Sequence, residues 1–172
     1  ARPRLQPGDE IIVSAAEHHA NLVPWLMVAE QTGAKVVRLP LNAHLLPGVE
    51  SLAQLITPRS RILALGQMSN VTGGCPDLAR AITLTHAAGM VVMVDGAQGI
   101  VHFPADVQQL DIDFYAFSGH KLYGPTGIGV RCWPNMALHC VQDNTVRNRC
   151  WQNWAYPGRY APHLHLIIRK VM

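Results

Sequence analysis

The sequence lacks an apolar run long enough to cross a membrane, which argues against a membrane-spanning protein. A transmembrane helix needs about 18 consecutive apolar residues, and no stretch of the 172 residues approaches that length. The first residues also lack the apolar core and cleavage site of a secretory signal peptide, and no methionine opens the chain. We therefore expect a cytoplasmic protein whose present N-terminus was cut from something longer.

Cysteine is also scarce, which excludes a small secreted scaffold held together by disulfides. The chain contains four cysteines, of which Cys75 lies alone before residue 131, and the other three are Cys132, Cys140 and Cys150. Secreted scaffolds of that kind carry many cysteines at close and regular spacing. The spacing here favours a reducing compartment, with the cytoplasm as the default.

Charged residues make up only 15% of the sequence, and the net charge of +3 is unevenly distributed. Residues 1–130 contain eight Lys or Arg against ten Asp or Glu, a balance of −2. Residues 131–172 contain six basic residues against one acidic residue, a balance of +5. Because the positive excess belongs to the last segment alone, we predict no nucleic-acid surface.

Apolar residues make up 49% of the sequence, enough for a buried core in one domain of this length. Short apolar runs alternate with helical patterns, which is typical of an α/β fold with a mostly parallel sheet and helices on both faces. Strands are predicted at 11–13, 35–39, 62–65, 90–94, 114–117 and 127–130, and helices at 20–32, 49–56 and 77–88.

The first predicted helix, 20–32, shows which of its faces should be buried. Leu22, Leu26 and Ala29 are spaced to form one apolar stripe along it. Pro24 is expected in the first turn, where a missing N–H costs little. Gly33 is expected to end the helix.

Polar side chains cluster after four of the predicted strands. They occupy residues 17–21, 69–70, 95–98 and 118–121. In a parallel sheet the carboxyl ends of the strands meet at one edge, and ligands bind there. The four clusters therefore predict one pocket built from converging polar groups.

These clusters resemble the class V aminotransferase-like enzymes that use pyridoxal phosphate, and within them the cysteine desulfurase and selenocysteine lyase group. The matching words are Glu-His-His-Ala-Asn (17–21), Ser-Asn-Val-Thr-Gly (69–73), Val-Asp-Gly-Ala-Gln (94–98) and Ser-Gly-His-Lys-Leu-Tyr-Gly-Pro-Thr-Gly-Ile-Gly (118–129). Gly-Gly-Cys-Pro-Asp (73–77) looks most like the cysteine sulfinate desulfinase branch. The resemblance runs from Pro7 to Val130 and implies part of the large domain of fold type I.

The resemblance implies roles for seven residues around one pyridoxal 5'-phosphate. Lys121 and His18 would be the catalytic residues: Lys121 would bind the cofactor aldehyde covalently, and His18 would stack on the ring and shuttle protons. Asp95 would keep the pyridine nitrogen protonated, so that the ring can accept electrons. The other four would hydrogen-bond the cofactor, Asn70 and Gln98 at the ring oxygen and Ser118 and His120 at the phosphate.

Structural alternatives remain open for several of these residues. Asp95 could cap a helix, Asn70 could end a loop, and the adjacent His18 and His19 could form a surface pair. A metal shared by the two histidines is not expected, because adjacent residues at a strand end point apart. Cys75 is expected to be a small packed residue.

The resembling enzymes are considerably longer than this chain. A phosphate-binding loop would precede residue 1, and a small domain with a nucleophilic cysteine and a carboxylate-binding arginine would follow residue 130. The intact family takes L-cysteine, cysteine sulfinate or selenocysteine, passes sulfur to an acceptor protein and forms homodimers, without nucleic-acid or membrane partners. We therefore expect a partial enzyme with weak or absent turnover. A non-catalytic remnant and another class V enzyme, such as an aminotransferase, remain alternatives.

Residues 131–172 differ from the rest in composition and pattern. They hold three of the four tryptophans and show no sustained period, and only 163–168 predicts a brief strand. His163 and His165 lie near cysteines, but their spacing matches no zinc motif, so no metal site is predicted. We expect a partial large domain over 1–130 and, over 131–172, an aberrant tail from a reading-frame shift, which sequencing the locus would test.

Overall fold

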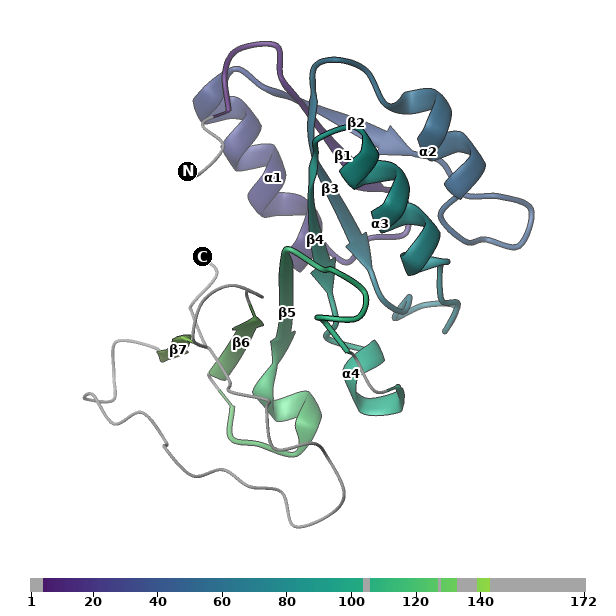
Figure 1. Ribbon diagram of the computed structural model, residues 1–172. Coiled ribbons are helices and arrows are strands. Elements are labelled where there is room, and N and C mark those ends of the chain that lie inside the picture. Colours follow the sequence, from purple (N-terminus) through teal and green to yellow (C-terminus); the bar gives the residue numbers. More distant parts are fainter. Residues whose placement is uncertain (1–4, 104–105, 127, 133–138, 143–172) are drawn as a thin grey trace.

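The computed structural model describes residues 5–103, 106–126, 128–132 and 139–142, which fold around one seven-stranded sheet (Figure 1). Its strands are β1 (Glu10–Ser14), β2 (Lys35–Leu39), β3 (Ser60–Gly66), β4 (Val91–Asp95), β5 (Phe114–Ser118), β6 (Ile128–Cys132) and β7 (His139–Gln142). The helices are α1 (His19–Thr32), α2 (Val49–Leu55), α3 (Leu78–Ala87) and α4 (Gly99–His102), with a 3₁₀ turn, η1 (Gly119–Leu122). The predicted α/β class is confirmed.

The order of the strands creates a crevice at one edge of the sheet. The order is β2-β1-β3-β4-β5-β6-β7, in which β1 to β5 are parallel and β6 and β7 are antiparallel. The chain leaves β1 toward β2 and then crosses back to β3, so the connections on the two sides of β1 diverge. Such a divergence leaves a crevice beyond the carboxyl ends of the strands, where ligands of open α/β sheets bind.

Helices cover both faces of the sheet, as predicted. On one face α2 and α3 pack with the strands around a core that includes Leu52, Ile82 and Leu63. On the other face α1 packs its residue Ala29 against Ile11 of β1 and neighbouring apolar residues. Figure 1 shows α1 on the opposite side of the sheet from α2 and α3. Burial on both faces explains why the central strands are continuous apolar runs rather than alternating ones.

Helix α1 differs from the prediction in which side chains it buries. Leu26 is 47% exposed, whereas Leu22 and Trp25 pack against the core. The indole of Trp25 is the largest apolar group of the helix, and packing it against the core turns the apolar stripe away from Leu26. Pro24 lies in the second turn rather than the first, so it supplies no N–H to the helical bond that the Ala20 carbonyl would accept there.

The sheet continues past residue 130. Strand β6 extends to Cys132 and pairs with β7, which lies between residues 139 and 142. The strand expected at 163–168 and most of segment 131–172 lie outside the described residues, so the division of the chain at residue 130 remains a prediction. No helix in the described ranges has the length and apolar character needed to cross a membrane.

Candidate functional site

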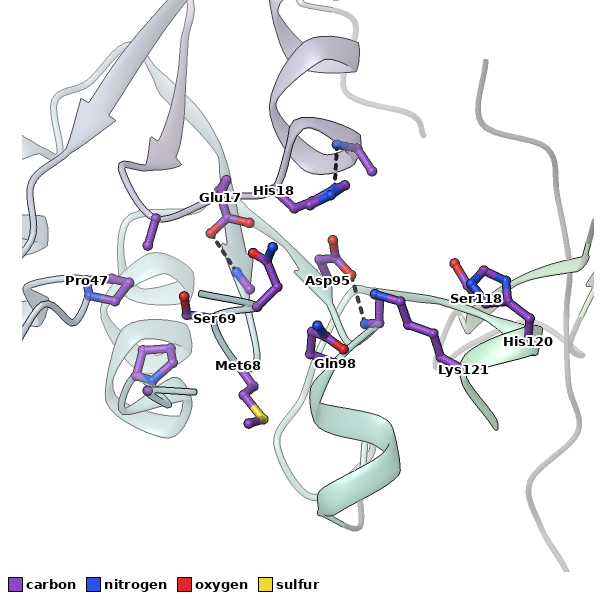
Figure 2. Close-up of a pocket in the computed structure, with 17 residues that line it drawn as sticks. Glu17, His18, Pro47, Met68, Ser69, Asp95, Gln98, Ser118, His120 and Lys121 are labelled. Atoms are coloured by element: carbon purple, nitrogen blue, oxygen red, sulfur yellow. Dashed lines mark hydrogen bonds between the residues drawn. The ribbon is translucent and has the colours of Figure 1, made fainter. Parts of the chain in front are cut away.

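A cleft of about 290 Å³ opens at the carboxyl edge of the sheet (Figure 2). It draws its walls from the ends of β1, β3, β4 and β5, the four places where the sequence clusters its polar residues. All seven predicted site residues line it: His18, Asn70, Asp95, Gln98, Ser118, His120 and Lys121. The volume lies near the lower end of the range for small-molecule sites, roughly 300–1,000 Å³.

Asp95 is the last residue of β4, and the turn after it is held from both sides. The carbonyl of Asp95 accepts a hydrogen bond from the N–H of Gln67 at 2.8 Å, and the N–H of Gly96 donates to the carbonyl of Ala116 at 2.8 Å. Its side-chain Oδ1 accepts the N–H of Ala97 at 2.8 Å. The carboxylate thus orders its own turn, whereas the N-cap position of α4 belongs to Gln98.

A buried polar pair supports this turn from below. The hydroxyl of Tyr115 donates to Oε1 of Gln67 at 2.6 Å, and both side chains are buried. A Cβ at Gly96 would overlap the Tyr115 ring, and one at Gly99 would overlap the Gln67 amide. Both glycines are therefore required by close packing, because any side chain there would displace the segment that carries Asp95.

The change Gly96→Ala is expected to destabilise the fold by about 2 kcal/mol, because it overpacks a filled space. Urea unfolding followed by circular dichroism measures this loss. Gly48→Ala is the matched control, since its Cβ meets nothing closer than the rotatable Ser51 Oγ at 3.1 Å. Equal stability losses in the two variants would contradict the packing argument.

Lys121 lies on the 3₁₀ turn η1, directly after β5. The N–H of Gly124 donates to the carbonyl of Gly119 at 3.0 Å, and this bond closes the segment around the lysine. The side chain extends toward Asp95 and Gln98 (Figure 2). None of the ion pairs among the described residues joins Lys121 to Asp95, so the amine is not occupied by that carboxylate.

The remaining hydrogen-bonding residues come from two segments, the end of β5 and the loop after β3. Ser118 and His120 flank Lys121, with His120 exposed. Asn70 belongs to a loop that Ser69 organises, since Ser69 Oγ accepts the N–H groups of Val71 at 3.2 Å and Thr72 at 3.3 Å. Asn70 therefore sits inside a closed turn rather than at the end of a loop.

His18 caps α1 as well as lining the cleft. Its Nδ1 accepts the N–H of Ala20 at 3.1 Å, so that nitrogen carries no proton in this arrangement. The rings of His18 and His19 lie 6.2 Å apart with an interplanar angle of 82°, and His19 does not line the cleft. The cap fixes the orientation of the imidazole at the mouth of the site.

Glu17 lines the cleft and is absent from the predicted site. Its Oε1 accepts the N–H of Gly66 at 2.8 Å, and its Oε2 accepts Nδ2 of Asn21 at 2.6 Å. Burial raises the pKa of the Glu17 carboxyl above its ordinary value, the hydrogen bonds from Asn21 and Gly66 lower it, and the nearby charge of Asp95 raises it. The signals in the sequence are its place in the polar cluster 17–21 and its four-residue spacing from Asn21.

The apolar residues that line the cleft were not predicted from the sequence either. Pro47, Met68 and Pro76 form part of the wall, from the loop before α2 and the loop after β3. No cysteine lines the described part of the cleft, and Cys75 is exposed rather than packed as expected.

Comparison with known proteins gives consistent matches. The family model described as aminotransferase class-V matches residues 1–144. Cysteine desulfurase CsdA of Escherichia coli strain K12 is 89% identical over 130 residues, which cover 76% of this chain and 32% of that protein. The chain thus spans about a third of the length of this relative.

Solved structures agree with the sequence matches. The crystal structure of E. coli CsdA in its S-sulfonic acid form has a TM-score of 0.75 and 87% identity, over 77% of this chain and 33% of that one. The cystine C–S lyase C-DES, in complex with its product cysteine persulfide, has a TM-score of 0.69 and 30% identity, over 76% and 36% of the two chains. A C-DES mutant with glycine covalently linked to its PLP cofactor matches with a TM-score of 0.69 and 29% identity, over the same shares.

Proposed function

Because the chain belongs to the aminotransferase class-V family, we propose that its cleft binds pyridoxal 5'-phosphate and forms the cofactor-attachment part of a cysteine desulfurase. The observation that supports this most is the meeting of Lys121 and Asp95 on one cleft, from the ends of two neighbouring parallel strands. The C-DES mutant with glycine linked to its PLP cofactor and the high identity to CsdA favour the same cofactor and reaction class.

The donor set of the cleft fits this cofactor. Pyridoxal phosphate presents an aldehyde, a basic ring nitrogen, a phenolic oxygen and a phosphate. The lining offers a primary amine on Lys121, a carboxylate on Asp95 and an aromatic imidazole on His18. Each functional group of the cofactor therefore has a partner of suitable chemistry, since amides and hydroxyls from both walls complete the set.

Each residue would do a distinct task. Lys121 would hold the cofactor covalently, and Asp95 would keep a proton on the ring nitrogen through a charge-assisted hydrogen bond. His18, fixed by its cap to Ala20, would cover one face of the ring and exchange protons through its other nitrogen. The four hydrogen-bonding residues would orient the ring and the phosphate: Asn70, Gln98, Ser118 and His120.

When bound, pyridoxal phosphate supplies an electron-withdrawing ring that stabilises negative charge on the substrate carbon next to the amine. The substrate we propose is L-cysteine, with cysteine sulfinate and selenocysteine as related candidates. The buried Tyr115–Gln67 pair would keep Asp95 from shifting when this charge develops. The expected compartment is the cytoplasm, in keeping with the cysteine usage of the sequence.

The complete reaction needs groups beyond the described cleft. Removal of sulfur from cysteine requires a nucleophilic thiol, and none lines the described part of the site. Delivery of sulfur to an acceptor protein and assembly into a homodimer are proposals for the intact enzyme. For the 172-residue chain by itself we therefore propose cofactor binding with little or no turnover.

Two measurements on the 172-residue chain test this function. Added pyridoxal phosphate should produce a visible absorption band, whereas sulfide release from L-cysteine should be roughly 10³-fold or more below that of a complete desulfurase, as is typical when a nucleophile is missing. A chain that gains no colour would contradict the proposal and favour a non-catalytic remnant. Transamination of L-alanine instead of any sulfur chemistry would favour an aminotransferase.

A further inference from the structure

Glu17 is the charged residue of the cleft that the proposed chemistry does not use. Of the carboxylates on the cleft, Asp95 has a partner in the cofactor and Glu17 has none. Both oxygens of Glu17 instead accept hydrogen bonds from the protein: one from the backbone of Gly66 at the end of β3 and one from Asn21 in α1. It therefore joins two elements that meet at the site.

In the hydrogen bonds from Asn21 and Gly66, Glu17 is the acceptor. Nε1 of Trp25 donates to Oδ1 of Asn21 at 3.2 Å, and Nδ2 of Asn21 donates to Oε2 of Glu17 at 2.6 Å. The N–H of Gly66 donates to Oε1 of Glu17 at 2.8 Å. The Ser14 side chain also hydrogen-bonds Glu17. Because Asn21 and Gly66 both donate here, a group that accepts at both oxygens satisfies them, and an ionised carboxylate is such a group.

His18 lies within the segment that this hydrogen-bond network holds. The bond from Asn21 to Glu17 spans the residues between them, and the carbonyl of His18 accepts the N–H groups of Asn21 at 2.9 Å and Leu22 at 3.1 Å. On its other side Glu17 is bound to Gly66, which pairs with Asp95 in the β3–β4 register. One side chain thus links the segment carrying His18 to the strand beside Asp95.

We infer that Glu17 is a positioning residue that fixes the His18 imidazole relative to the Asp95 carboxylate, and so shapes the gap in which the cofactor ring binds. The inference rests on the proposed function for its ligand, and on the hydrogen-bond network for its geometry. Figure 2 shows Glu17, His18 and Asp95 around the same part of the cleft.

The electrostatic setting argues against a purely space-filling role. Burial and the charge of Asp95 both raise the pKa of the Glu17 carboxyl, so the ionised form carries a cost that the hydrogen bonds offset only in part. An uncharged side chain would avoid that cost, but it would leave the donor of Asn21 or of Gly66 without an acceptor.

The test compares Glu17→Gln with the double variant Glu17→Gln/Asn21→Asp. In the single variant, the new amide at position 17 has one oxygen and cannot accept from both Asn21 and Gly66. Whichever way this amide and the Asn21 amide are turned, one N–H group faces another donor. In the double variant the amide at position 17 can donate to the carboxylate at position 21, which also accepts from Trp25. We expect Glu17→Gln to weaken pyridoxal phosphate binding about tenfold, and the double variant to recover most of that loss. Glu30→Gln, an exposed change on α1, should leave binding unchanged.

A double-mutant cycle with His18→Ala separates positioning from general stability. If Glu17 acts through His18, Glu17→Gln should weaken cofactor binding much less in the His18→Ala background than in the wild type. Additive effects, or wild-type affinity in Glu17→Gln, would overturn the inference. Melting temperatures of all variants identify any that fail to fold. If Glu17→Gln does not fold, the variant Glu17→Gln/Asn21→Asp, in which the hydrogen bonds are restored, still tests the inference.

Amide exchange of the unliganded chain keeps this inference distinct from the proposed function. Loss of positioning should speed exchange at the Ala20 amide, which is bound to His18 Nδ1. If the wild type binds no pyridoxal phosphate, the proposed function fails, and this exchange then decides the role of Glu17. Unchanged exchange in Glu17→Gln would reject the role, and faster exchange would support it.

Discussion

Replacing Lys121 with alanine will abolish the visible absorption band that pyridoxal phosphate gives with the wild-type chain. The loss should be complete, because the amine of Lys121 is the one described lysine group on the cleft that can bond to an aldehyde. Reduction with borohydride followed by peptide mass analysis should locate the cofactor on residue 121 in the wild type and nowhere in the variant.

Lys35→Ala is the matched control for this experiment. Lys35 is exposed and opens β2 at the edge of the sheet, away from the residues that line the cleft. Its removal should leave the absorption band and the site of attachment unchanged. A persistent band in Lys121→Ala would show that the cofactor attaches elsewhere and would remove the basis of the proposed site.

The change Asp95→Asn should weaken pyridoxal phosphate binding by about 100-fold, or about 3 kcal/mol, since it removes the charged partner of the ring nitrogen. The asparagine oxygen can still accept the N–H of Ala97, so the turn should keep its shape. Titration of the apo chain with pyridoxal phosphate, followed by absorbance, measures the dissociation constant.

Asp77→Asn provides the comparison for Asp95→Asn. Asp77 is exposed and caps α3 by accepting the N–H of Arg80 at 3.0 Å, and asparagine caps helices equally well. This variant loses one negative charge without touching the cleft, so its cofactor affinity should match that of the wild type. Equal weakening in both variants would mean that net charge, and not Asp95, governs binding.

Much of the fold follows from local patterns in the sequence. The strands that became β3 and β4 are short, almost wholly apolar runs, and strands buried on both faces have this character. The position of the site follows equally, because polar residues directly after such runs must collect at the carboxyl edge of a parallel sheet. The placement of Asp95 and Lys121 on the cleft could be predicted for this reason, whereas their roles are what the resemblance to class V enzymes implies.

Other features depend on tertiary contacts that no local pattern contains. Leu26 has the spacing of a core residue, yet the partly buried Trp25 packs against the core and Leu26 stays exposed. The pairing of Tyr115 with Gln67 joins residues 48 positions apart, and neither neighbours a recognisable motif. Glu17 belongs to a polar cluster that was expected at the pocket, but only its burial and the bond to Gly66 reveal how it is held there.

The residues that line the cleft are far apart in the sequence, and this affects how the protein folds. Its walls come from segments as distant as Glu17 and Lys121, so the binding surface is complete only once β1, β3, β4 and β5 have paired. Such long-range pairing is the slow part of folding. A ligand that binds this surface recognises the finished sheet alone and protects it by mass action. Bound pyridoxal phosphate should therefore make the folded chain more resistant to proteolysis.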